Sequence, residues 1–168
     1  SELVPNKLGL TIMIDYAHTP SSLQSILETV KPYTKGRVIC TWGVGGDRDA
    51  AKRPIMGEIS GTYADFTVLT SDQVRTENPQ KILDEIEVGL KKVTDQYVVI
   101  LNRTDAIRYS IKMATKDDII VIPGLGSDLY IDYMGTKYFY DERIVIHDII
   151  EEIITGKKLN VNTVIFDK

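Results

Sequence analysis

The chain has 168 residues, of which 43% are hydrophobic and 26% charged, with a formal net charge of −4 at pH 7. This composition is typical of one soluble globular domain and excludes a disordered or fibrous protein. The acidic balance argues against a nucleic-acid-binding protein, and the apolar runs are far shorter than the roughly 20 residues that a membrane span needs.

The N-terminus shows no charged-then-apolar signal pattern, so we expect a cytoplasmic protein that has no membrane partner. Cys40 is the only cysteine, which excludes an internal disulfide and a cysteine zinc cluster. We expect Cys40 to be a buried small hydrophobe.

Apolar runs typical of β-strands alternate with amphipathic, helix-length segments along the whole chain. We predict strands over residues 10–16, 36–42, 65–70, 97–102 and 117–123. The helices follow over residues 20–33, 54–63, 79–93 and 103–114, with a last helix over 143–155. Alternating runs around residues 134–136 predict a hairpin, and residues 156–168 form an edge strand or an ordered tail.

Near-continuous apolar strands separated by helices indicate a mostly parallel sheet covered on both faces. The fold class is therefore α/β: a single Rossmann-like three-layer domain, with its core over about residues 10–155 and a C-terminal β-hairpin. In such sheets ligands bind at the carboxyl edge of the strands. The polar and glycine-rich segments follow strands directly, so we expect them at that edge; they are residues 15–20, 43–53, 71–78, 102–105 and 124–128.

The segment GVGGDRDAAKR, residues 43–53, has glycines after a strand but does not fit the known phosphate-binding loops. The third glycine of a dinucleotide fingerprint is replaced by Arg48, and the chain has no Gly-x-x-x-x-Gly-Lys-Ser/Thr run. Its glycines permit close backbone approach, and Arg48, Lys52 and Arg53 near a helix start favour an anion, either phosphate or carboxylate. A flexible turn with solvated charges is the alternative interpretation.

Charges of both signs are expected to gather at the same edge. Arg53 and Arg75 would bind carboxylates, while Asp72 and Asp128 would bind an ammonium group, so the set suits a zwitterion. A self-paired surface network of charges is the alternative.

Five of these segments together resemble the C-terminal domain of the Mur ligases. They are DYAHTP, GVGGDRDAAKRPIMGEI, YADFTVLTSDQVRTENP, NRTDAIRYSI and IPGLGSDLY. The similarity covers about residues 10–150 with order and spacing kept, and it is strongest to the members that add the third residue of the peptidoglycan stem peptide.

The resemblance implies a domain of an ATP-dependent ligase of peptidoglycan synthesis, and so of cell-wall biogenesis, cell shape and division. Such ligases phosphorylate the terminal carboxylate of a UDP-N-acetylmuramoyl dipeptide, and the amine of the incoming amino acid attacks the acyl phosphate. In the family an N-terminal domain binds UDP, and a central ATPase domain binds ATP and Mg²⁺. We expect both domains to be absent from this chain, and the isolated domain to be inactive, with neither a catalytic residue nor a metal site of its own.

The resemblance also assigns residues by position. It places Asp15 at the ATP ribose and His18 near the nucleotide phosphates. The positions where the family binds the incoming amino acid are Arg53, Asp72, Gln73, Arg75, Gly124 and Asp128. Members that use meso-diaminopimelate carry Asp-Asn-Pro-Arg, whose arginine binds the distal carboxylate, and lysine-adding members usually lack that arginine. Arg75 therefore favours meso-diaminopimelate or a similar diacid.

Two departures leave the substrate open. Gln73 and Val74 replace the usual Asn-Pro, and the usual Gly-Lys-Gly-His-Glu is Gly-Leu-Gly-Ser-Asp at residues 124–128. The acid at 128 is one carbon shorter, which changes its reach toward a distal ammonium. A lysine-adding ligase and a binding or regulatory module without ligase activity remain as alternatives, whereas the failed glycine fingerprint disfavours a nucleotide-dependent oxidoreductase.

Overall fold

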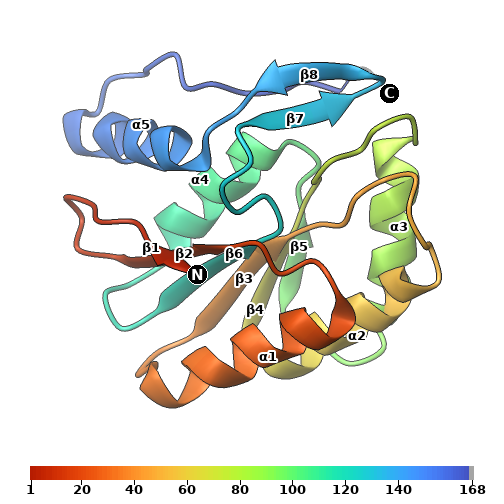
Figure 1. The fold of residues 1–168 in the computed structure, drawn as a ribbon. Coiled ribbons are helices and arrows are strands. Elements are labelled where there is room, and N and C mark those ends of the chain that lie inside the picture. Colours follow the sequence, from red (N-terminus) through yellow and green to blue (C-terminus); the bar gives the residue numbers. More distant parts are fainter. Residues whose placement is uncertain (167–168) are drawn as a thin grey trace.

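A computed structural model describes residues 1–166 (Figure 1). Its strands are β1 Glu2–Leu3, β2 Thr11–Asp15, β3 Val38–Trp42, β4 Phe66–Leu69, β5 Tyr97–Val99, β6 Ile119–Pro123, β7 Tyr130–Tyr133 and β8 Thr136–Phe139. Its helices are α1 Pro20–Val30, α2 Lys52–Tyr63, α3 Pro79–Leu90, α4 Arg103–Met113 and α5 Glu142–Thr155, and a 3₁₀ turn, η1, covers Lys31–Tyr33. No helix within the described part of the chain is both long and apolar enough to cross a membrane.

The predicted mostly parallel sheet is confirmed, and its strand order is β1-β2-β6-β3-β4-β5. Strands β2, β6, β3, β4 and β5 run parallel to one another, while β1 pairs antiparallel with β2 at one edge. The two residues of β1 carry too little pattern to be predicted from the sequence. The return of the chain from α4 to β6 places that strand between β2 and β3, so the loops that follow β2, β6, β3 and β4 become neighbours.

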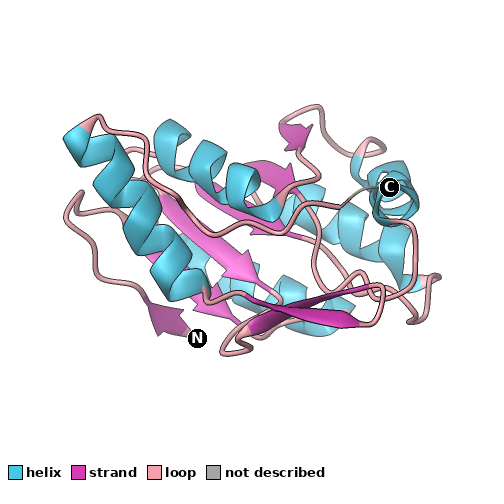
Figure 2. Ribbon diagram, turned by 90° about the horizontal axis from the view of Figure 1, so that it is seen from above, coloured by secondary structure: helices cyan, strands magenta, loops and turns pink. Residues whose placement is uncertain are grey.

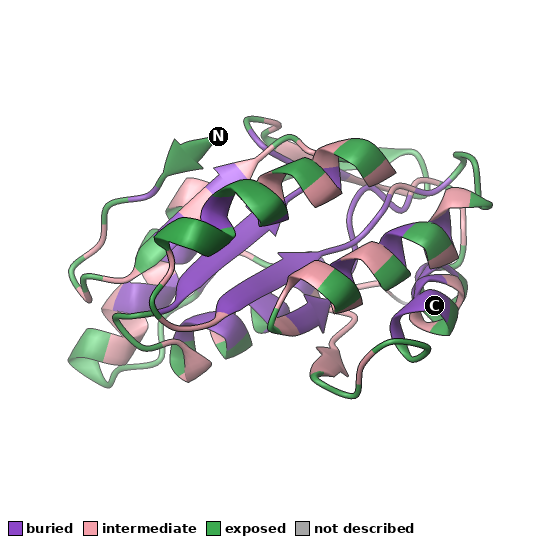
Figure 3. Cartoon of the chain, turned by 90° about the horizontal axis from the view of Figure 1, so that it is seen from below, coloured by how far each residue is buried: buried purple, intermediate pink, exposed green. Residues whose placement is uncertain are grey.

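Helices cover both faces of the sheet, as predicted (Figures 2 and 3). Helices α1, α2 and α3 pack on one face, and α4 and α5 pack on the other. Alternation along β3 supplies both cores: Cys40 and Trp42 pack toward α1–α3, while Ile39 packs toward α4 and α5. The prediction that Cys40 is buried is confirmed.

Local capping explains why the helices begin directly beyond the carboxyl ends of the strands. Thr19 accepts a hydrogen bond from the Ser22 N–H and forms a capping box ahead of α1. Asn78 and Asn102 cap α3 and α4 in the same way. Helix α1 ends at Val30, three residues before the predicted end, because the following Lys-Pro-Tyr run tightens into η1.

The segment after α5 is ordered but forms no strand within residues 156–166. Val161 and Val164 join the core beneath α4 and α5, and Thr163 exchanges hydrogen bonds with Asn102. Val4 also belongs to this core, so the core extends beyond the predicted limits of 10–155 at both ends. The predicted hairpin is confirmed as β7 and β8, which pair antiparallel above the sheet edge.

Candidate functional site

The loops that follow β2, β6, β3 and β4 enclose a cavity of about 230 Å³ at the carboxyl edge of the sheet. Sites for drug-sized ligands span about 300–1,000 Å³, so this cavity matches a smaller ligand such as an amino acid. Its lining residues are Tyr16, His18, Gly45, Arg48, Lys52, Asp72, Gln73, Arg75, Gly124, Asp128 and Tyr130. Six of the eight residues that the sequence predicts for ligand binding are therefore brought together; the two that lie elsewhere are Asp15 and Arg53.

Asp72 forms the buried floor of the cavity, with 8% of its surface exposed. Its Oδ1 accepts a hydrogen bond of 2.6 Å from the Gln73 N–H. Burial raises the pKa of the Asp72 carboxyl group, and the nearby guanidinium of Arg103 opposes that rise. Gly124 lies directly against this carboxylate, because a Cβ at Gly124 would collide with Asp72 Oδ2. Only glycine fits here, since its φ of +126° also lies where L side chains are strained.

Arg75 enters the cavity from the loop after β4, with its backbone in the left-handed region at φ +52°. Its Nη1 donates to the Gly46 carbonyl at 2.8 Å, while its backbone pairs with Tyr133 of the hairpin. Within residues 1–166 neither Arg75 nor Asp128 forms a salt bridge, so both charges border the cavity without a fixed counterion. Such groups are available to pair with a ligand.

Gln73 lines the cavity, but its side-chain amide is occupied by the hairpin. Its Nε2 donates to the Tyr130 carbonyl at 2.8 Å, and its Oε1 accepts from the Asp132 N–H at 2.6 Å. Gln73 therefore anchors β7 beside the cavity and brings Tyr130 to its rim.

Arg53 lies outside the cavity and is fully buried. Its guanidinium contacts Glu77 at 2.6 and 2.9 Å and Glu85 at 3.0 Å. These hydrogen bonds lower the pKa of Glu77 to about 2. The direct carboxylate contact predicted for Arg53 stays a prediction, and in this structure the guanidinium ties the segment after β3 to the loop after β4.

The glycines of the GVGGDRD segment allow the same close contact between the segment after β3 and the loop after β4. A Cβ at Gly43 or Gly46 would collide with the backbone oxygens of Thr70 or Val74 in the following loop. The segment can therefore pack against the loop after β4 only with glycine at these positions. The close backbone approach inferred from the sequence occurs between two loops of this domain.

His18, Arg48 and Lys52 also line the cavity and form its cationic corner. The Lys52 Nζ donates to the His18 carbonyl at 3.4 Å, and the His18 ring contacts Tyr16 edge to face at 4.8 Å. Asp15 lines a separate hollow next to this corner, and its Oδ2 accepts from the Ala17 N–H at 2.7 Å. Within residues 1–166, no group of three or more His, Cys, Asp or Glu side chains is placed to bind a metal ion.

Sequence reasoning missed two kinds of residue. Tyr16 and Tyr130 line the cavity, and only their positions beside predicted ligand-binding loops could have indicated this. Arg103 and Glu142 are almost completely buried beneath Asp72, at 2% and 1% exposure. Each begins a helix, where a charged side chain is ordinarily solvated, so the sequence alone gives no sign of their burial.

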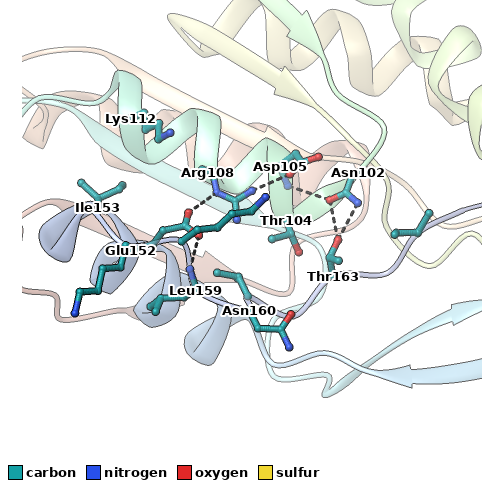
Figure 4. Close-up of a pocket in the computed structure, with 15 residues that line it drawn as sticks. Asn102, Thr104, Asp105, Arg108, Lys112, Glu152, Ile153, Leu159, Asn160 and Thr163 are labelled. Atoms are coloured by element: carbon teal, nitrogen blue, oxygen red, sulfur yellow. Dashed lines mark hydrogen bonds and ion pairs between the residues drawn. The ribbon is translucent and has the colours of Figure 1, made fainter.

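A larger hollow of about 840 Å³ lies between α4 and residues 156–165 (Figure 4). Its two acidic side chains, Asp105 and Glu152, both bond to Arg108. On the tail, Thr163 bonds to Asn102, and the Leu159 N–H donates to Glu152. These contacts hold the tail against the helices. None of the residues predicted to bind a ligand lines this hollow, so the smaller cavity remains the candidate site.

Comparison with known proteins gives the same family as the sequence motifs. A profile described as Mur ligase, glutamate ligase domain, matches residues 1–126. The chain is 49% identical over 142 residues to a UDP-N-acetylmuramoyl-L-alanyl-D-glutamate–2,6-diaminopimelate ligase of Caldanaerobacter subterraneus subsp. tengcongensis, covering 84% of this chain and 29% of the relative. It is 45% identical over 146 residues to the enzyme of that name from Clostridium tetani, covering 87% of this chain and 30% of the relative. The chain thus spans about 30% of the length of these relatives.

The fold agrees with this result. A solved structure of a UDP-N-acetylmuramoyl-L-alanyl-D-glutamate–2,6-diaminopimelate ligase matches 91% of this chain and 31% of its own, with a TM-score of 0.85 and 30% identity. A UDP-N-acetylmuramate–alanine ligase from Thermotoga maritima shares the fold at 16% identity, with a TM-score of 0.57 and coverage of 93% and 30%. The chain belongs to the Mur ligase family, of which it forms the C-terminal, glutamate ligase domain.

Proposed function

We propose that this chain is the amino-acid-binding domain of a cytoplasmic, ATP-dependent ligase of peptidoglycan synthesis. The ligase would add a diamino diacid of the meso-diaminopimelate type to UDP-N-acetylmuramoyl-L-Ala-D-Glu. The observation that carries the proposal is the convergence of Asp72, Arg75 and Asp128 on one cavity of about 230 Å³. Relatives at 45–49% identity bear the name of a diaminopimelate-adding ligase, which supports the same substrate class.

The charges of the cavity are complementary to those of the proposed substrate. A diamino diacid carries two carboxylates and two ammonium groups at neutral pH. Arg75 offers a planar pair of donors to a carboxylate, whereas Asp72 and Asp128 accept from ammonium groups. L-Lysine lacks the second carboxylate, so the guanidinium of Arg75 favours the diacid.

The cationic corner formed by His18, Arg48 and Lys52 fits the negative charge of a nucleotide phosphate or of an activated carboxylate. Asp15 Oδ1 is paired in this structure with the amine and the hydroxyl of Ser1, at 3.1 and 2.6 Å, so a ribose hydroxyl would bind to Asp15 by displacing Ser1. ATP, bound mainly by the central domain together with Mg²⁺, would supply the phosphoryl group that activates the substrate. We propose no metal ligand in this chain.

In this account the domain closes over its own central ATPase domain, and the sheet edge brings the amine of the bound amino acid to the activated carboxylate of the UDP-linked dipeptide. Closure also excludes water, which would otherwise hydrolyse the activated group. Arg53 holds together two loops that line the site, since its guanidinium is already paired with Glu77 and Glu85.

The test is a product assay with the full-length protein that carries this domain. We expect ATP cleavage and formation of a UDP-linked tripeptide only when the UDP-linked dipeptide, Mg²⁺ and meso-diaminopimelate are all present. Tripeptide formation with L-lysine in preference to the diacid would show a lysine-adding ligase. ATP turnover without any amino-acid dependence, or no turnover, would favour a binding or regulatory module.

A further inference from the structure

We infer that Arg103 and Glu142 are positioning residues that keep the Asp72 carboxylate charged and free to bind an ammonium group of the incoming amino acid. Arg103 lies in the NRTDAIRYSI segment, but the resemblance assigns no role to it or to Glu142, and neither residue lines the cavity. The inference rests on the proposed function, because it assumes that the ligand of Asp72 is a diamino acid.

The three side chains form one buried cluster that joins three separate parts of the chain. Arg103 begins α4, Glu142 begins α5, and Asp72 lies in the loop after β4. The Arg103 Nε donates to Glu142 Oε2 at 2.6 Å, and its Nη1 donates to the Ser71 carbonyl at 2.7 Å. The same Nη1 lies 3.9 Å from Asp72 Oδ2, which is too long for a hydrogen bond.

The hydrogen-bond pattern leaves one atom of Asp72 unused. Its Oδ1 accepts from the Gln73 N–H, whereas Oδ2 accepts no hydrogen bond within residues 1–166. That oxygen lies against Gly124, which also lines the cavity. A ligand ammonium entering the cavity would therefore find an acceptor that the protein has not used.

The charges of the cluster do not cancel. Two carboxylates face one guanidinium, so with all three ionised the cluster carries one negative charge at the floor of the cavity. A buried charge of this kind is costly unless a partner arrives, and an ammonium group is a suitable partner. Burial raises the pKa of Asp72, and the charge of Arg103 is the first of the groups that oppose that rise, ahead of the Gln73 N–H and Arg75.

Glu142 controls how strongly the Arg103 guanidinium interacts with the Asp72 carboxylate. Its contact at 2.6 Å holds the guanidinium in place, so Arg103 supports the ionised state of Asp72 from 3.9 Å without occupying Oδ2. Without the charge of Glu142, Arg103 would pair with Asp72 directly and compete with the ligand. Without Arg103, Asp72 would lose a positive charge that favours its ionised state. Both losses weaken binding of the amino acid.

The test uses the full-length ligase and the variants Glu142→Gln, Asp72→Asn and their combination. Glu142→Gln keeps the volume and an acceptor for Arg103 but removes the charge. We expect it to raise the KM for meso-diaminopimelate about tenfold, the size expected for one charge-assisted hydrogen bond, with kcat and the KM for ATP nearly unchanged. In the Asp72→Asn background the same substitution should add little, because the two residues act through one contact with the ligand.

Asp118→Asn is the matched control. Asp118 is also buried, at 5% exposure, and it accepts from Arg37 at 3.0 Å, but it precedes β6 and so lies at the opposite edge of the sheet. The Asp118→Asn variant should lower the stability of the fold without changing the KM for the amino acid. Should Glu142→Gln fail to fold, Arg103→Met combined with Glu142→Leu replaces the buried pair by apolar groups, which proteins often tolerate. This pair should also raise that KM.

The outcomes separate the two proposals. Asp72→Asn should raise the KM for the amino acid. If it does, but Glu142→Gln changes that KM equally with and without Asp72→Asn, or no more than Asp118→Asn does, the positioning role is wrong. The proposed function then stands. If Asp72→Asn itself leaves that KM unchanged, or the wild-type protein shows no activity that depends on the amino acid, both proposals are contradicted.

Discussion

Arg53 Nη2 lies 2.6 Å from Glu77 Oε1, and this ion pair joins the segment after β3 to the loop after β4. Glu77 also accepts a hydrogen bond of 2.7 Å from the Asp47 N–H, and Asp47 in turn accepts from Thr76. These contacts join the two loops, and other residues of both loops, Gly45 and Arg75 among them, line the cavity. Arg53 therefore joins two loops that line the cavity, and its direct contact with a carboxylate of the ligand stays a prediction.

Arg53→Ala should lower the free energy of unfolding by about 3 kcal/mol, because it removes one partner of a buried ion pair. Chemical denaturation measures this change directly. Arg143→Ala, which removes an exposed partner of Glu2, is the control and should cost less than about 1 kcal/mol. A large loss of amino-acid binding by Arg53→Ala with no change in stability would instead show the direct carboxylate contact.

The stability of the domain should fall in acid partly through Glu77. Its pKa is lowered from 4.5 to about 2 in the folded state, so the unfolded chain binds the proton more readily. The stabilisation is present above pH 4.5 and is lost as the pH falls toward about 2. Glu77→Gln should flatten this part of the stability profile, as measured by denaturation across that range. An identical acid slope in the variant would contradict the assignment.

Gly124→Ala should weaken the site as well as the fold, because the added methyl group would displace the Asp72 carboxylate. The strained φ of +126° adds a cost of about 1–3 kcal/mol. Gly135→Ala is the matched control: its φ is +83°, but no atom lies within 4 Å of the new methyl group. Both variants should lose stability, and only Gly124→Ala should raise the KM for the amino acid. Equal KM values for the amino acid in the two variants would contradict the placement of Asp72 at the floor of the binding cavity.

Arg75→Ala should change substrate choice. We expect kcat/KM with meso-diaminopimelate to fall about 100-fold and that with L-lysine to change little, because only the diacid offers a second carboxylate. Arg48 lines the same cavity and belongs to the cationic corner that we propose for phosphate, so Arg48→Ala should change kcat/KM for both amino acids alike. Equal losses with both amino acids in Arg75→Ala would remove the role assigned to Arg75.

Much of this architecture was predictable because strand and helix periods are local signals. The helices, the parallel strands and the hairpin follow from apolar spacing, and parallel strands must deliver their loops to one edge. That rule alone brings together the residues at 18, 72, 75 and 128, which are far apart in sequence. The interior location of β6 and the short β1 depend on pairing between distant segments, which periodicity does not encode.

Whether each charged side chain is buried or exposed was less predictable from the sequence, because burial depends on which other segments pack against it. Arg53 and Arg75 look alike in the sequence, yet one is enclosed by two glutamates and the other borders the cavity. Arg103 is enclosed because α5 returns Glu142 to it from 39 residues away. Tertiary contacts of this kind decide which charges are available to a ligand.

Whether the amino acid binds in this cavity can be measured as the equilibrium affinity of the full-length protein for meso-diaminopimelate, with the UDP-linked dipeptide and a non-hydrolysable ATP analogue present. We expect wild-type protein and the variant Lys112→Ala, which alters the hollow of Figure 4, to bind equally. Asp72→Asn and Arg75→Ala should each weaken binding at least tenfold, about 1.4 kcal/mol. Unchanged affinity in both of these variants, or a loss confined to Lys112→Ala, would show that the amino acid binds elsewhere.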